Sequence, residues 1–224
     1  MSTTIPRLYT ARICPFAQRP RIVAALKNIQ LEEEEIDLTN KSASFLEVNP
    51  QGKVPALKIR PDSDTMVESL VVAEYLDEVS EGPSLMGADP EERAYTRQWI
   101  AWFGDNYIPT FYQFMRAQEA AEQAEKREKL EAALEVFEAQ ARKKAGEGPF
   151  LTGSTVGMLD VATVPFFERI AVLTHYRHWV LPARFEFLHR WLKAMDSTPY
   201  AKTKATDEYL VEKYVSYAKT VSPK

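Results

Sequence analysis

The chain contains a single cysteine, Cys14, in a position where a thiol can react. It follows the apolar stretch Leu8–Thr10 and precedes Pro15, a residue favoured in the first turn of a helix. Backbone N–H groups and the helix dipole stabilise an anion at such a position, where cysteine pKa values fall to roughly 3.5–7.5. Two interpretations stay open at this point: a reactive thiolate, or the small buried residue that most lone cysteines are.

Other patterns that could carry chemistry are absent or weak. A single cysteine allows neither an internal disulfide nor a cysteine-rich zinc site. His175 and His178 are three residues apart, but no Cys, Asp or Glu stands at ligand spacing, so we expect no metal. The glycines form no phosphate-binding loop, and no serine lies in a nucleophile-elbow pattern.

The first part of the chain has the pattern of a β-α-β unit, followed by a β-β pair and a helix. A turn at residues 60–64 separates the paired strands, and Ser69 is expected as the N-cap of the last helix. The expected elements are Leu8–Thr10, Phe16–Asn28, Glu35–Leu38, Val54–Ile59, Thr65–Val67 and Ser69–Asp77.

From about Val79 onward we expect helices and no strand. Residues 80–90 are rich in helix breakers and are predicted to be a linker. The helices are expected at Glu91–Met115, Glu119–Ala145, Leu159–Leu173 and Arg184–Ala194. The predicted domains are therefore residues 1–79, with an α/β fold, and residues 91–224, which are all-α.

Composition excludes several classes of partner. The chain has 224 residues, 45% of them hydrophobic, and a formal charge of -4, so nothing favours binding to nucleic acid or anionic lipid. No apolar run approaches the roughly 20 residues of a membrane-spanning helix. The first residues lack the apolar core of a secretory leader, so we expect a cytoplasmic protein.

Several motifs together resemble the glutathione transferase superfamily, and the Cys-Pro-Phe-Ala form is similar to its cysteine-type, omega-class branch. The resemblance implies a thioredoxin-like N-terminal domain with a mixed four-stranded sheet, followed by an all-α domain, and it suggests a homodimer. The motifs are Cys14–Arg19, Asn49–Leu57, Glu68–Ser69 before a helix with Glu74–Leu76, and Phe166–Arg169.

The resemblance implies that glutathione is the co-substrate and Cys14 the catalytic residue. The bond before Pro55 would be cis, with the backbone of Val54 turned toward the cysteinyl part of glutathione. Taken without the motifs around it, Val54-Pro55 would more simply be a trans proline at the start of an edge strand. The residues matched to glutathione binding are Phe16, Leu38, Lys41, Val54, Pro55, Glu68 and Ser69.

A small hydrophobic or oxidised second substrate is expected between the two domains, in a cleft whose helical wall is apolar. Most of an aromatic stripe at helical spacing is core, so we expect two or three of the candidates to touch substrate. The candidates are Tyr107, Phe111, Phe114, Met115, Phe166 and Arg169.

The chain departs from the superfamily pattern at Gly157. The family caps a helix there with Ser or Thr three residues before Asp160, whereas glycine is only a few tenths of a kcal/mol worse as a cap. We therefore expect at most a small gain from Gly157→Ser, and a cost of ~0.5–2 kcal/mol from Asp160→Ala if its side chain caps the helix.

The leading functional hypothesis is a glutathione-dependent thiol transferase or reductase that acts on disulfides or dehydroascorbate. Ordinary conjugation of glutathione to electrophiles is an alternative, although transferases of that type have Ser or Tyr in place of Cys14. A third hypothesis is a non-catalytic binding or regulatory protein on the same scaffold.

Overall fold

The computed structural model describes residues 5–218, which divide into two compact units. The first unit, here called the sheet unit, runs to Ser84 and includes Thr198–Thr203. The second, the helical unit, comprises Leu85–Ser197 and residues 204–218. The division at Ser84 falls inside the segment that the sequence predicts as a linker.

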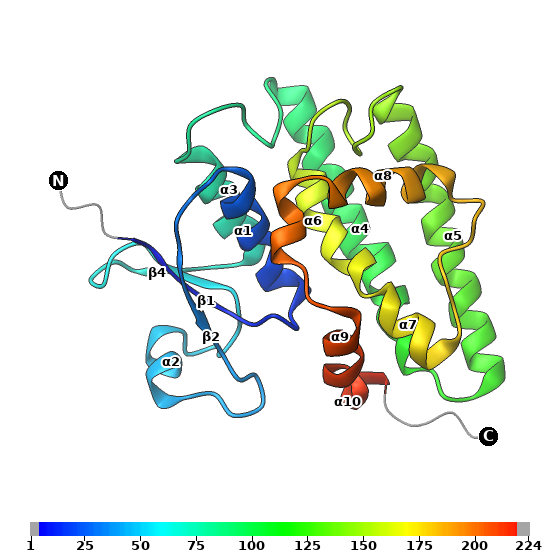
Figure 1. Ribbon diagram of the computed structural model, residues 1–224, viewed down its shortest axis with the longest axis horizontal. Coiled ribbons are helices and arrows are strands. Elements are labelled where there is room, and N and C mark those ends of the chain that lie inside the picture. The colour runs from blue at the N-terminus through cyan, green and yellow to red at the C-terminus, as the bar shows by residue number, and fades with distance from the viewer. Residues whose placement is uncertain (1–4, 219–224) are drawn as a thin grey trace. The chain divides into compact units, whose positions relative to one another are not determined.

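The sheet unit contains a four-stranded sheet in the order β2-β1-β3-β4. β1 and β2 are parallel, while β1 with β3 and β3 with β4 are antiparallel, so the sheet is mixed as predicted. Helices α1 and α3 pack against each other in this unit (Figure 1). The elements are β1 (Arg7–Thr10), α1 (Pro15–Leu26), β2 (Glu32–Glu35), α2 (Ala43–Val48), β3 (Ala56–Lys58), β4 (Thr65–Val67) and α3 (Ser69–Glu78).

One core of the sheet unit is built from Tyr9, Ile36, Phe45 and Ala56, which are 7% exposed or less. Phe45 comes from α2, a helix that the sequence analysis missed because a single turn-and-a-half has too little periodicity to detect. Its N-cap is Ser42, whose hydroxyl accepts a hydrogen bond from the backbone N–H of Phe45 at 3.2 Å.

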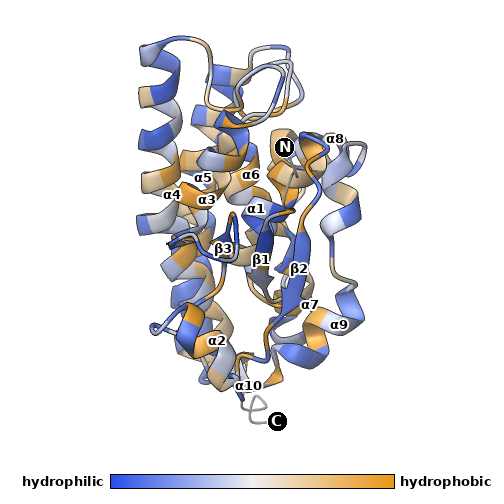
Figure 2. Ribbon diagram, turned by 90° about the vertical axis from the view of Figure 1, so that its left-hand side faces the viewer, coloured by the Kyte–Doolittle hydropathy of each residue, from blue (hydrophilic) through white to orange (hydrophobic). Residues whose placement is uncertain are grey.

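The predicted position of β2 was wrong by three residues, because the strand is the acidic run Glu32–Glu35 rather than Glu35–Leu38. Such a run has no apolar alternation, and Figure 2 shows β2 as hydrophilic. Arginines compensate its charge: Arg7 lies 2.8 Å from Glu32 and Arg21 lies 2.8 Å from Glu33. Charged side chains on an edge strand also discourage pairing with another chain.

The helical unit is built around α6, in which every residue from Met158 to Phe167 is buried. The rings of Phe103, Tyr107 and Phe167 stack on one another beside it. The helices of this unit are α4 (Pro90–Arg116), α5 (Ala120–Ala145), α6 (Met158–Glu168), α7 (Ile170–Arg177), α8 (Glu186–Asp196), α9 (Asp207–Lys213) and α10 (Val215–Ala218).

Two predictions for this part of the chain were wrong. The helix expected over Leu159–Leu173 is interrupted at Arg169, which ends α6 and precedes α7. The 3-10 helix η1 (Pro199–Thr203), predicted to belong to the helical domain, packs in the sheet unit. Gln18 and Arg21 of α1 donate hydrogen bonds to the carbonyl oxygen of Thr203 at 3.4 and 3.3 Å, which ties η1 to α1.

The start of α6 is closed by a buried carboxylate. Asp160 Oδ2 accepts a hydrogen bond from the Gly157 N–H at 2.8 Å, and Oδ1 accepts from the Leu151 N–H and the Trp191 indole N–H at 2.9 and 2.7 Å. Burial raises the pKa of Asp160 to about 6, although the three donors oppose that shift. The side chain therefore joins three segments in addition to capping a helix.

Candidate functional site

The thiol of Cys14 lies at the start of α1, as the sequence predicts. Cys14 is the N-cap in an extended conformation (φ -82°, ψ 115°), Pro15 follows in the first turn, and the Cys14 side chain makes no cap hydrogen bond. The Cys14 N–H donates to the Ala11 carbonyl at 2.9 Å, which closes a tight turn between β1 and α1. The half-buried sulfur thus lies at the positive end of the helix dipole.

The segment before β3 comes close to this thiol. The peptide bond between Val54 and Pro55 is cis, as the resemblance implies, and the Val54 carbonyl oxygen lies 4.0 Å from Cys14 Sγ. Asn49 fixes this segment, because its side chain donates to the Lys53 carbonyl at 2.8 Å and accepts from the Gln51 N–H at 3.2 Å. Val54 also packs on the core of the sheet unit.

The start of α3 is a second helix end without a side-chain cap. Its N-cap is Glu68, not Ser69 as predicted, and Glu68 has a φ of 69°. A left-handed conformation is uncommon in a residue other than glycine and is found most often at functional sites. Ser69 is therefore the first helical residue, and its N–H belongs to the first turn, which has no acidic side chain.

The sequence analysis gave no role to Arg19, although the residue stands in the quoted motif. Arg19 is buried, and its guanidinium donates a hydrogen bond to the Ser69 hydroxyl at 3.0 Å. The same group lies 5.0 Å from the ring centre of half-buried Phe16. Burial lowers the pKa of Arg19 to about 10, while the charge of the Cys14 thiolate opposes the shift. In the sequence, the only signal that could have pointed to Arg19 was a charged residue directly before a proline inside the expected helix.

Leu38 and Lys41 lie on the segment after β2. Asp37 shapes this segment, because its carboxylate accepts from the Thr39 N–H at 2.8 Å. Leu38 packs against the core of the sheet unit. The exposed Lys41 extends across Gly52, so that its Nζ is 3.4 Å from where a Cβ on Gly52 would lie. Lys41 is thereby brought to the segment that carries Val54.

The candidates for the second-substrate cleft are buried in the structure. All six have an exposed fraction of 2% or less. Tyr107 stacks on Phe103 and Phe167, and Arg169 donates to the Pro165 carbonyl at 2.6 Å, so both are part of the core of the helical unit. Their contact with a substrate stays a prediction, and their burial weighs against it. The set is Tyr107, Phe111, Phe114, Met115, Phe166 and Arg169.

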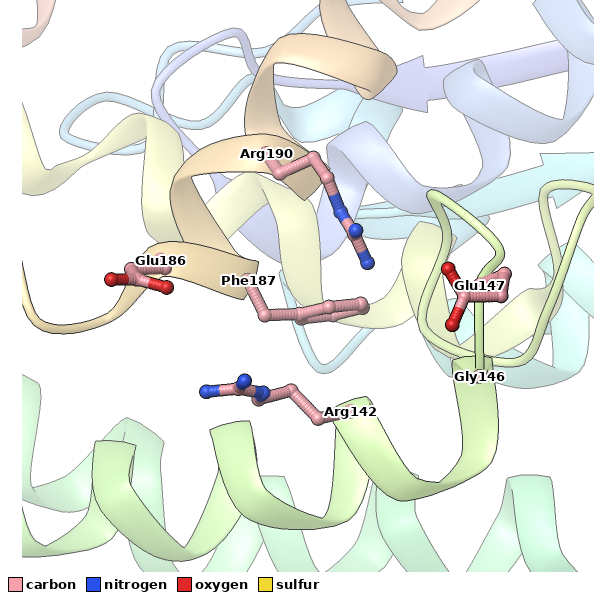
Figure 3. Close-up of a pocket in the computed structure, with 6 residues that line it drawn as sticks. All are labelled: Arg142, Gly146, Glu147, Glu186, Phe187 and Arg190. Carbon is pink, nitrogen blue, oxygen red and sulfur yellow. The ribbon is translucent and has the colours of Figure 1, made fainter.

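The helical unit also has a surface cavity of about 490 Å³ at the ends of α5 and α8. Figure 3 shows Arg142 and Arg190 on either side of the Phe187 ring, and the Arg190 guanidinium lies 5.2 Å from its centre. Glu147 and Glu186 complete a wall with equal numbers of opposite charges. Nothing in this lining can act as a thiol nucleophile.

Within residues 5–218, no group of three or more His, Cys, Asp or Glu side chains is arranged to hold a metal ion. No helix in the same range is long and apolar enough to cross a membrane.

Two family models match the chain, one in each of the two units just described. The N-terminal domain of glutathione S-transferase matches residues 8–84, and the C-terminal domain matches residues 119–194. Glutathione S-transferase omega-1 of Mus musculus is 31% identical over 222 residues, covering 97% of this chain and 87% of that protein. The chain belongs to the glutathione S-transferase family.

Solved structures of glutathione S-transferases agree with this assignment. Glutathione transferase Omega 3C from Trametes versicolor superimposes with a TM-score of 0.85 at 27% identity, covering 96% of this chain and 90% of that one. A dehydroascorbate reductase from Chlamydomonas reinhardtii gives 0.80 at 27% identity, covering 96% and 100%. The thioredoxin-like domain followed by a helical domain, as predicted, is therefore the fold of this chain.

Proposed function

We propose that this glutathione S-transferase is a thiol transferase and reductase of the omega-like type, with Cys14 as its nucleophile. The observation that carries the proposal is the thiol at the N-cap position of α1, 4.0 Å from the Val54 carbonyl oxygen. The similarity to an omega-class transferase and a dehydroascorbate reductase supports the same chemistry.

The reaction proceeds in two exchanges of disulfide for thiolate. The Cys14 thiolate attacks the glutathionyl sulfur of a mixed disulfide, a Cys14–glutathione disulfide forms, and the substrate leaves as its thiolate. A second molecule of glutathione then attacks the glutathionyl sulfur, which releases oxidised glutathione and restores the Cys14 thiolate. With dehydroascorbate, two molecules of glutathione supply the two electrons and two protons that yield ascorbate.

The residues around Cys14 are matched to the parts of glutathione. The N–H and C=O of Val54 pair with the cysteinyl part, as a short antiparallel strand does. The first turn of α3, with Ser69, takes the γ-glutamyl carboxylate, since helix starts bind anions, and the exposed Glu68 carboxylate takes the ligand's ammonium. Phe16 and Leu38 flank the ligand and Lys41 pairs with its glycyl carboxylate.

The proposal also covers where the enzyme works and in what form. The reaction belongs in the cytoplasm, where thiols are kept reduced. A homodimer is the form that the family resemblance implies, and size-exclusion chromatography with light scattering tests it.

A parallel assay of three activities tests the proposed function. Purified protein is assayed for reduction of a glutathione mixed disulfide, reduction of dehydroascorbate and conjugation of an aryl halide, with Cys14→Ala as the matched variant. We expect both reductions in the wild type and neither in Cys14→Ala. Conjugation by both proteins, with no reduction by the wild type, indicates the ordinary transferase instead, and no activity in the wild type indicates a binding protein.

A further inference from the structure

We propose that Arg19 is the positioning residue of the site and that its guanidinium acts on two anions, the carboxylate of the ligand and the Cys14 thiolate. It orients the Ser69 hydroxyl toward the carboxylate of the ligand, and it stabilises the Cys14 thiolate. The inference rests on the proposed function, since both anions belong to that reaction.

The hydrogen bond between Arg19 and Ser69 determines which way the hydroxyl can point. A guanidinium only donates hydrogen bonds, so the Ser69 oxygen is the acceptor in the 3.0 Å contact. The Ser69 hydroxyl proton then points away from Arg19 and is available to donate a hydrogen bond to another acceptor. Because Ser69 begins α3, that proton and the first N–H groups of the helix can meet the same carboxylate.

The link between Arg19 and Cys14 is electrostatic. Cys14 is the N-cap of the helix that carries Arg19, and the guanidinium lies 5.0 Å from the ring centre of Phe16, two residues after the thiol. The thiolate opposes the effect of burial on the Arg19 pKa, and the interaction between two charges is reciprocal, so the guanidinium favours the thiolate. Arg19 is buried and Cys14 is half-buried, so salt screens their interaction less than that of an exposed pair.

Two other cations of this helix region pair with carboxylates. Arg21 lies 2.8 Å from Glu33, and Lys27 lies 2.8 Å from Asp77. Glu35, at the end of β2, accepts a hydrogen bond from the Arg12 N–H at 2.8 Å and brings a negative charge to the turn before Cys14. Glu68 is exposed to solvent. Arg19 is the buried cation on α1 that interacts electrostatically with the Cys14 thiolate.

The test combines binding and thiol reactivity in three single variants. Binding of S-methylglutathione is measured by calorimetry, and the pH midpoint of Cys14 alkylation is measured with iodoacetamide. Arg19→Gln should weaken binding about 10- to 100-fold, since hydrogen bonds through charged groups have that value, and should raise the midpoint by about one pH unit. Arg21→Gln, the same change two residues along α1, should leave both within about twofold of the wild type.

Arg19→Lys separates positioning from simple packing. Lysine keeps the charge but lacks the planar fork, so the alkylation midpoint should return toward the wild-type value while ligand binding stays weak. A residue needed only for packing would not give this split. In a Ser69→Ala background, Arg19→Lys should weaken binding no further, because the hydroxyl that Arg19 orients is gone.

Two outcomes overturn the inference. One is that folded Arg19→Gln, or Arg19→Lys if Arg19→Gln does not fold, matches the wild type in both measurements. The other is an additive effect of Arg19→Lys and Ser69→Ala on binding. If the wild type itself binds no S-methylglutathione, the proposed function fails first, and the two failures are distinguished.

Discussion

Two helix starts of the helical unit are closed by carboxylates, whereas two helix starts of the sheet unit are not. In the helical unit, Asp89 accepts from the Glu91 and Glu92 N–H groups at the start of α4, and Asp160 accepts from the Gly157 N–H at the start of α6. In the sheet unit, α1 and α3 begin at Cys14 and Glu68 with no side-chain cap and no acidic residue in the first turn.

This difference separates stability from function. An acidic cap satisfies the first N–H groups and offsets the helix dipole, so the helix end has little remaining attraction for an anion. A helix start without such a cap keeps that attraction at some cost in stability. In this protein the starts of α1 and α3 are the ones that we match to a thiolate and a carboxylate.

The largest predicted effect is the loss of the Asp160 carboxylate. Asp160→Ala leaves three buried N–H donors without an acceptor, and each such group costs about 1–3 kcal/mol. We expect the free energy of unfolding to fall by about 3 kcal/mol or more, above the ~0.5–2 kcal/mol of a simple cap. Urea denaturation measures it, and a change below about 1 kcal/mol would show that these donors find other acceptors.

A smaller effect is expected from the ionisation of Asp160. Its pKa is raised from 3.8 to about 6 in the folded protein by burial. A raised pKa means that the folded protein binds the Asp160 proton more tightly than the unfolded chain does, so protonation of Asp160 stabilises the fold. This contribution to the free energy of unfolding is complete below about pH 4 and is lost as the pH rises through about 6. The total is on the order of 3 kcal/mol. Asp160→Asn should remove this part of the pH profile, and identical profiles for variant and wild type contradict the expectation.

The next effect tests the glycine at the same cap. A Cβ on Gly157 would lie 2.8 Å from Thr152 Oγ1 and 3.2 Å from the Leu85 carbonyl oxygen, which corrects the expectation of a small gain from serine. Gly157→Ser should cost about 1 kcal/mol through overpacking. Gly104→Ala is the matched control, because nothing lies within 4 Å of a Cβ there, and it should gain about 0.5–1 kcal/mol. Thermal unfolding of both variants decides the signs.

The smallest effect sharpens the comparison directly. Cys14→Asp places a favoured N-cap residue at the start of α1, where the backbone already has the extended conformation of an N-cap. The variant should gain about 0.5–1 kcal/mol in unfolding free energy and lose disulfide reduction entirely. A loss of stability in this variant, measured by urea denaturation, would contradict the expectation that the first N–H groups of α1 can accept a side-chain cap.

Much of the sheet unit follows from its sequence, because helix signals and turn signals there are local. Pro15 after Cys14 correctly predicted the start of α1, and the motif around Pro55 correctly implied its cis bond. The strand Glu32–Glu35 could not be found this way, since four consecutive glutamates show no apolar alternation and the strand forms by pairing with β1, which is distant in sequence.

The parts of the site that the sequence did not reveal depend on tertiary contacts. A role for Arg19 could not be predicted from the sequence, because its contact with the Ser69 hydroxyl, at 3.0 Å, forms only in the folded chain. The N-cap of α3 is Glu68 rather than the predicted Ser69, because Glu68 adopts a positive φ, which is unusual for its residue type. Tyr107 and its neighbours have an amphipathic spacing that cannot distinguish a cleft wall from a core.

The most direct test of the central claim is the mass of the intact protein after treatment with oxidised glutathione. With a single cysteine in the chain, a mixed disulfide on Cys14 has no second thiol to resolve it and must accumulate. We predict one glutathionyl group, located at Cys14 by peptide mapping and removed by reduced glutathione at a rate compatible with turnover. An unmodified Cys14 in the folded protein, or full disulfide reduction by Cys14→Ala, would contradict the account.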